Sequence, residues 1–226
     1  MEPFRGSSRN GVRSSLRTVL RNAWSLTAVL LLPAALLFAA ESRVMILADF
    51  SSKDQQGFPS GWEAQSSLAK AQQAYTVRSD AAETFLGARH ARQRVFKRIA
   101  WDPHTLPIVS WKWRLKAPPP KEADTIAAVY VSLDTDLFVI PVATKYVWSV
   151  NKPKGATTDG GIFGASEIVL RNGTSPVGEW VEERVNAYED FKRLHQHEPA
   201  QQAWGISLLG GPGVEVDFGP IAVSGP

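Results

Sequence analysis

The feature that most constrains this chain is the alternation of apolar and polar side chains with a period of two. In the segment VSWKWRL (109–115), Trp111 and Trp113 fall on one side, and Lys112 and Arg114 fall on the other. A strand directs successive side chains to opposite faces, so the pattern predicts a strand with one buried and one solvent-facing side. Similar strand-forming segments are found at 44–50, 75–78, 84–88, 95–99, 129–133, 145–150, 167–171, 180–185, 204–208 and 214–218.

These strands predict the fold class. Clusters of glycine, proline and asparagine separate them, as turns do. Many short strands with one polar and one apolar face favour antiparallel sheets packed face to face. One short helix is predicted from about Ala187 to Leu194, with Asn186 as its N-cap and Glu189 completing a capping box. We therefore predict an all-β fold, a jelly-roll-like antiparallel β-sandwich with one short helix near the C-terminal third.

Residues 1–42 differ in composition from the rest of the chain. The first 22 residues hold five arginines and one glutamate, and an uncharged, mostly apolar run follows from Ala23 to Ala40. This order is typical of a secretory signal, with Ala40-Glu41-Ser42 as the cleavage site. The alternative is an uncleaved anchor helix, which would be the chain's one contact with a membrane. Both interpretations place the sandwich domain, residues 43–226, outside the cytoplasm, in the periplasm or the extracellular space.

Charge and cysteine content exclude several classes of protein. The chain has 25 basic and 22 acidic residues, and removing the five arginines and one glutamate of the first 22 residues leaves 20 and 21. The predicted domain is therefore not basic, and no nucleic-acid partner is expected. The absence of cysteine excludes a disulfide framework, a thiol nucleophile and thiolate metal sites.

Aromatic and charged side chains supply the candidate ligand-binding residues. Core packing is the default interpretation of a tryptophan, and Trp111, Trp113 and Trp204 share a register with aliphatic neighbours. Trp62 and Trp101 fall at strand ends or in loops, where an exposed ring can stack on a sugar. The polar face of 109–115 can add charged hydrogen bonds to a ligand. The predicted ligand-binding residues are Trp62, Trp101, Lys112, Arg114, Tyr130, Trp148 and Arg184.

No motif identifies a catalytic centre or a metal site. The G-x-S-x-G, H-E-x-x-H, Walker A and Rossmann patterns are absent. Glu182 and Glu183 fall on opposite faces of a strand, so they cannot form the facing carboxylate pair that glycoside hydrolysis requires. Asp134 and Asp136 offer two carboxylates, whereas calcium takes about six to eight oxygen ligands. We therefore predict no cofactor, with calcium at 134–136 as the alternative.

Four pieces of sequence carry a family resemblance. They are 47–50 with 57–62, 107–114, 129–131 with 145–148, and 178–184 with 186–191. Their order and spacing resemble an uncharacterised family of exported bacterial proteins, the domain-of-unknown-function family numbered three thousand and forty-seven. The chain departs from that family where Val185 separates Arg184 from Asn186, and where 208–213 contains no acidic residue. The resemblance implies a secreted sandwich domain and brings no known reaction.

Three functions are consistent with these observations. The favoured one is an exported, non-catalytic sandwich that binds a glycan or another component of the cell envelope. The second is an envelope polysaccharide hydrolase or lyase, with a cluster around Arg114, Tyr130 and Arg184. The third is a structural or assembly protein that meets a protein partner through an apolar patch or a sheet edge.

Overall fold

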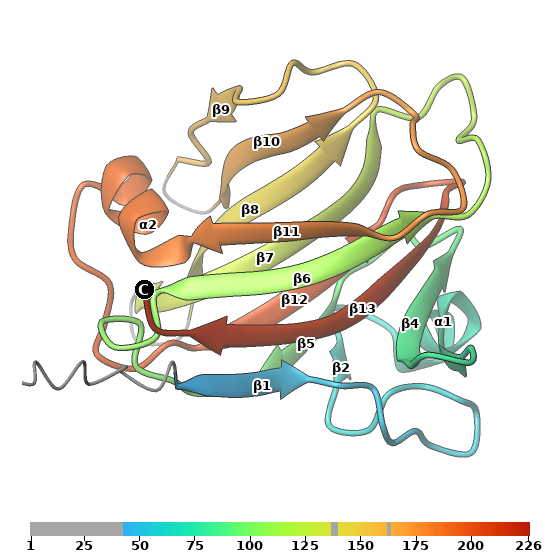
Figure 1. The fold of residues 1–226 in the computed structure, drawn as a ribbon, viewed down its shortest axis with the longest axis horizontal. Coiled ribbons are helices and arrows are strands. Elements are labelled where there is room, and N and C mark those ends of the chain that lie inside the picture. Colours follow the sequence, from blue (N-terminus) through green and yellow to red (C-terminus); the bar gives the residue numbers. More distant parts are fainter. Residues whose placement is uncertain (1–42, 137–139, 162–163) are drawn as a thin grey trace, which may run out of the picture. The chain divides into compact units, whose positions relative to one another are not determined.

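The protein is described from a computed structural model, which covers residues 43–136, 140–161 and 164–226. Within these residues the chain forms thirteen strands and two helices (Figure 1). The strands are β1 (Val44–Ala48), β2 (Glu63–Ala64), β3 (Tyr75–Ser79), β4 (Thr84–Arg89), β5 (Val95–Arg98), β6 (Ile108–Leu115), β7 (Thr125–Asp136), β8 (Ile140–Ser149), β9 (Thr157–Thr158), β10 (Ser166–Asn172), β11 (Val181–Asn186), β12 (Gly205–Gly210) and β13 (Glu215–Ser224). The helices are α1 (Leu68–Ala74) and α2 (Ala187–His195).

The strands form two sheets, which we call the β6 sheet and the β7 sheet. The β6 sheet has the strand order β11-β6-β13-β4-β3, and β1 also pairs with β13. The β7 sheet has the order β2-β5-β12-β7-β8-β10-β9. The sheets pack against each other through their apolar faces, which confirms the predicted jelly-roll-like β-sandwich.

An aromatic cluster joins the two sheets. Trp111 and Trp113 of β6 point into the core, as their alternation predicts, and their ring centroids are 5.5 Å apart. The Trp111 ring lies 5.6 Å from Tyr146, and the Trp113 ring lies 5.8 Å from Trp148, both on β8. All four side chains are buried. The largest apolar surfaces in the chain therefore hold the sandwich together.

The strand pairing differs in one place from the predicted antiparallel arrangement. Strand β10 runs parallel to β8, with Lys145 opposite Glu167 and Tyr146 opposite Ile168. Parallel neighbours need a crossover of about a dozen or more residues. Residues 150–165 provide this length and contain the short strand β9, which pairs with β10. The β7 sheet is therefore mixed, and the connection between β8 and β10 is long enough for the crossover that this pairing requires.

One helix was predicted for the sandwich domain, and its described residues form two. The predicted helix is α2, and the Asn186 side chain accepts a hydrogen bond of 3.0 Å from the Glu189 backbone N–H, as expected of an N-cap. The additional helix α1 has Ser67 as its N-cap. The Gln93 side chain accepts hydrogen bonds from the backbone N–H groups of Ser66 and Ser67 and fixes the start of α1. Tertiary contacts therefore stabilise a helix that is too short to have a clear apolar period.

The membrane and export predictions concern a different part of the chain. Among the described residues, no helix is long and apolar enough to cross a membrane. The predicted signal or anchor, residues 1–42, lies outside the described residues.

Candidate functional site

A row of five side chains crosses the solvent-facing side of the β7 sheet. Each member lies directly opposite the next in the strand register, so the row runs perpendicular to the strands. Neighbouring strands are about 4.8 Å apart, so four intervals span about 19 Å. In order from β5 to β10, the row consists of Phe96, Ser207, Tyr130, Lys145 and Glu167.

This row lies in an open groove of about 800 Å³. An apolar cluster lies on the same face of the sheet, and it includes Tyr130 and Ala143, which line the groove. Leu209, which packs against this cluster, also lines the groove. Further lining residues come from segments outside the central strands, at 92–94 before β5 and at 158–160, which begins with the last residue of β9. The groove therefore combines apolar side chains with polar and charged ones, a combination found in ligand-binding sites.

Aromatic rings occupy the β5 end of the groove. The Trp204 ring lies 5.6 Å from Phe96, and the Arg98 guanidinium lies 5.4 Å from the Trp204 ring. Both rings are partly exposed and line the groove. An exposed tryptophan face is the kind of surface on which the apolar face of a sugar can pack.

The position of Trp204 corrects the prediction that it belongs to the core. Ile206 and Leu208 are fully buried, as their register predicts, but Trp204 is not. Gly205 intervenes with φ +150°, and a Cβ at this position would lie 2.2 Å from the Lys97 carbonyl oxygen. The alternation of side chains is therefore interrupted at a position that only glycine can occupy, and the Trp204 ring faces the groove.

A charged cluster occupies the β10 end of the groove. Lys145 and Lys152 each donate a hydrogen bond of 2.7 Å to Glu167, one to each carboxylate oxygen. Burial raises the pKa of Glu167, but these two lysines outweigh burial and lower the pKa below its ordinary value. Glu167 is therefore an ionised anchor, and neither of its oxygens is free to carry a proton for general acid catalysis.

We expect Glu167→Gln to destabilise the protein by about 1–3 kcal/mol at pH 7, because one lysine loses its acceptor and the other keeps only a neutral one. The folded-state pKa of Glu167 is lowered, so its stabilisation is present at neutral pH and is lost as the pH falls below about 4.5. The stability difference between wild type and variant should therefore shrink in acid. Urea unfolding at pH 7 and pH 3.5 measures it, and a difference that is constant with pH would contradict this account.

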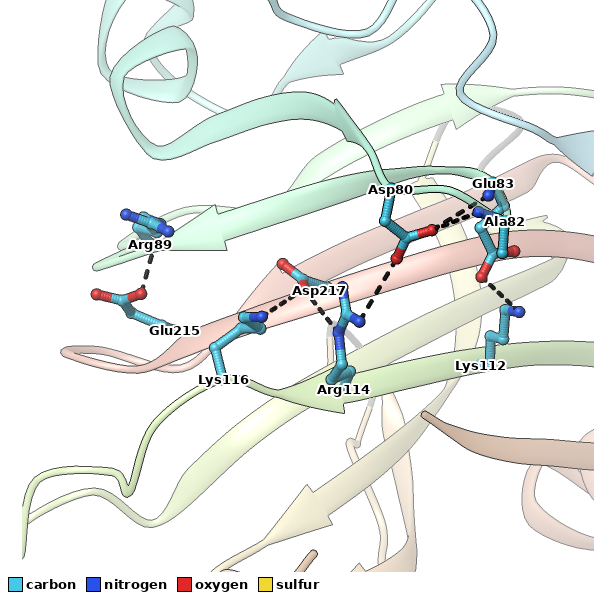
Figure 2. A network of polar contacts seen from close by, with 9 residues as sticks. All are labelled: Asp80, Ala82, Glu83, Arg89, Lys112, Arg114, Lys116, Glu215 and Asp217. Atoms are coloured by element: carbon cyan, nitrogen blue, oxygen red, sulfur yellow. Dashed lines mark hydrogen bonds and ion pairs between the residues drawn. The ribbon is translucent and has the colours of Figure 1, made fainter. Parts of the chain in front are cut away.

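The solvent-facing side of the β6 sheet carries a second set of charges, shown in Figure 2. The Arg114 guanidinium donates two hydrogen bonds to Asp217, at 3.0 and 2.8 Å, and also contacts Asp80 at 3.6 Å. Lys112 forms an ion pair of 2.5 Å with Glu83. The Trp180 ring covers the Arg114 guanidinium at 4.2 Å. This network ties β6, β13 and the β3–β4 hairpin together, so its cations already have partners.

A smaller hollow of about 380 Å³ adjoins this network. Lys112 and Arg184 line it, with Ser110 and Glu182 between them on the paired strands β6 and β11. Lys112, Arg114 and Arg184 therefore lie on one face of the β6 sheet. Tyr130 lies on the other sheet, in the 800 Å³ groove, so the cluster of Arg114, Tyr130 and Arg184 suggested for a lyase does not exist.

The three remaining predicted site residues lie in the core. Trp62 is 7% exposed and stacks on Phe50 at 5.7 Å, and Trp101 is 5% exposed. Trp148 is fully buried and donates a hydrogen bond of 2.8 Å to the Gly173 carbonyl. None of these rings has an open face, because each one anchors a loop or a strand to the sandwich core. The structure thus separates the predicted set into three places.

A sequence-family comparison agrees with the resemblance found above. The family model described as "Protein of unknown function (DUF3047)" matches residues 60–209, about two thirds of the chain. The protein belongs to DUF3047. Every residue that lines the 800 Å³ groove lies inside the matched range. No curated protein matches the sequence.

Comparison with solved structures gives distant similarity. An endoglucanase, Cel12A from Rhodothermus marinus, is 10% identical with a TM-score of 0.43, covering 80% of this chain and 98% of that one. A carbohydrate-binding module that recognises mannan is 9% identical with a TM-score of 0.39, covering 81% and 99%. The adhesin domain of Lys-gingipain is 10% identical with a TM-score of 0.42, covering 80% and 99%.

The acidic residues considered for calcium have other partners in this DUF3047 protein. Asp134 and Asp136 lie at the end of β7 and pair with β8 through Val142 and Ile140. The Asp134 side chain accepts a hydrogen bond from the Thr135 backbone N–H. Within 43–136, 140–161 and 164–226, no three His, Cys, Asp or Glu side chains are grouped so that they could hold a metal ion.

Sequence reasoning overlooked most of the residues that form the groove of this family member. Phe96, Lys145 and Glu167 were each placed on strands, but their common row depends on the register of four strand pairs. Arg94 precedes β5 and has no pattern of its own. The sequence shows which side chains lie on the polar face of each strand. It does not show which strands are neighbours, and the site can be identified only once that order is known.

Proposed function

We propose that this protein binds a glycan along the groove of the β7 sheet without cleaving it. The observation that carries the proposal is the row from Phe96 to Glu167, which crosses five strands in an 800 Å³ groove. A length of about 19 Å suits an extended chain of linked sugars better than a single small molecule. The partly exposed Trp204–Phe96 pair provides an aromatic platform, and Ser207 and Lys145 provide polar contacts.

Binding rather than hydrolysis is supported by the carboxylates of the described groove. Two of them line it, Asp159 and Glu167. Both Glu167 oxygens accept hydrogen bonds from lysines, and Asp159 accepts one from the Gly161 backbone N–H. A glycosidase needs one carboxyl group that holds a proton near neutral pH. The lowered pKa of Glu167 favours the opposite protonation state.

We expect Trp204→Ala to weaken polysaccharide binding about tenfold, because the variant loses the exposed platform, worth about 1–2 kcal/mol. Trp180→Ala is the matched control: Trp180 is also partly exposed, but it lies over Arg114 on the other sheet. Affinity electrophoresis against a panel of soluble polysaccharides measures both variants. Equal effects of the two substitutions, or no binding of any polysaccharide by the wild type, would contradict the proposal.

A further inference from the structure

We propose that the ligand of this groove is an acidic glycan, and that the carboxylate of a uronic acid binds against Arg94. This inference rests on the proposed function and assigns the substrate class to the same site. Its first support is the charge of the groove. The described lining has four cationic side chains and only two carboxylates, Asp159 and Glu167. The cations are Arg92, Arg94, Arg98 and Lys145.

Pairing within the protein leaves some of these cations without partners. Lys145 is neutralised by Glu167, which also pairs with Lys152. Arg98 contacts the carboxylate of Glu63 at 3.8 Å. Arg92 and Arg94 form no ion pair with any carboxylate of the described residues. On the β6 sheet, by contrast, Arg114 and Lys112 are paired. Two cations that no described carboxylate pairs with, Arg92 and Arg94, therefore line the groove.

The surroundings of Arg94 suit it to receive a planar anion. Its guanidinium lies 4.5 Å from the centre of the Tyr130 ring, and Tyr130 is only 8% exposed. Two hydrogen bonds fix the Arg94 backbone. The Arg94 backbone N–H donates to the Gln65 side chain, and the Gln65 backbone N–H donates to the Arg94 carbonyl oxygen. No hydrogen-bond acceptor from the described residues engages the Arg94 side chain. The Arg94 guanidinium therefore lies against the Tyr130 ring, and no described residue accepts a hydrogen bond from it.

Arginine chemistry points to a carboxylate ligand. The five N–H donors of a guanidinium form a rigid fork that fits a carboxylate with two parallel hydrogen bonds. Lys145 lies 5.9 Å from the same Tyr130 ring, and the cluster of Lys145, Lys152 and Glu167 carries one net positive charge, because two lysines share one carboxylate. A uronic acid combines this carboxylate with a sugar ring that can pack on the Trp204–Phe96 platform.

The test compares polygalacturonate with its fully methyl-esterified form, which has the same sugar without the charge. The protein expressed from the full sequence should bind polygalacturonate at least tenfold more tightly than the ester, since the ester cannot form charge-assisted hydrogen bonds with Arg94. Arg94→Gln should abolish most of this preference. Arg89→Gln is the control, because it removes one positive charge, as Arg94→Gln does, but on the other sheet. There Arg89 pairs with Glu215 (Figure 2).

Each alternative outcome has a definite meaning. Equal binding of acid and ester, or an unchanged preference in Arg94→Gln, overturns the inference. If the ester still binds in a manner that depends on Trp204, glycan binding stands and only the acidic class fails. If neither polymer nor any neutral polysaccharide binds, both proposals fail. Polyglutamate is included as a polyanion without sugar, and binding as tight as that of polygalacturonate would overturn the inference, since charge alone would then suffice.

Discussion

Replacing Trp113 with alanine should destabilise the protein by about 3–5 kcal/mol, the cost of truncating a fully buried tryptophan. The Trp113 side chain is 0% exposed and lies between Trp111 and Trp148, so its loss opens a cavity between the two sheets. Its indole N–H also donates a hydrogen bond of 3.2 Å to Glu183, which would lose a donor. Urea unfolding followed by far-UV circular dichroism gives the free energy of unfolding.

Trp204→Ala is the matched control for this measurement. The same atoms are removed, but the ring is partly exposed in the groove, so the loss of stability should be well below that of Trp113→Ala. Losses of equal size in the two variants would mean that Trp113 does not hold the core as described. A loss of less than about 1 kcal/mol for Trp113→Ala would mean the same.

Replacing Arg171 with methionine should cost about 2–3 kcal/mol at pH 7, because it leaves the Glu183 carboxylate without its charged partner. Arg171 of β10 donates a hydrogen bond of 2.6 Å to Glu183 of β11, and this contact links the two sheets at one edge. The Glu183 side chain is 14% exposed and that of Arg171 is 33% exposed. The expected cost therefore lies below that of breaking a fully buried pair.

The pH dependence of this variant has a definite sign. Burial raises the pKa of Glu183 above its ordinary value, although Arg171 and Trp113 partly oppose this. Without Arg171 the pKa should rise further, so the folded protein would hold a proton that the unfolded chain releases. Stability of Arg171→Met should therefore increase as the pH falls from 7 toward 5. The double variant Arg171→Met with Glu183→Gln should recover much of the loss, and a double variant as unstable as the single would contradict this role.

The sequence predicted most of the fold because burial in a sandwich imposes a period of two. The segment 109–115 shows this directly, with Trp111 and Trp113 in the core and Lys112 and Arg114 on the outer face. The two-residue strands β2 and β9 were missed because two residues cannot show alternation. The parallel pairing of β10 with β8 was missed because alternation is identical in parallel and antiparallel strands.

The candidate site was harder to predict, because it depends on which strands are neighbours. Trp62 and Trp101 occupy loops, and loop position suggested exposure, but both rings fold back into the core. Trp204 was assigned to the core from its register, and the φ of Gly205 reverses that assignment. A period of two identifies the two faces of a strand. It does not show where a single glycine ends the period.

The central claim is that the groove of the β7 sheet receives a glycan, and the indole N–H signals of the tryptophans test it most directly. These signals, assigned by single Trp→Phe variants, would be followed by NMR during titration with polygalacturonate and with neutral polysaccharides. We expect the Trp204 signal to shift with saturation, while the core residues Trp111 and Trp113 stay unchanged. A shift of Trp180 on the other sheet without a shift of Trp204, or no shift with any polysaccharide, would contradict the account.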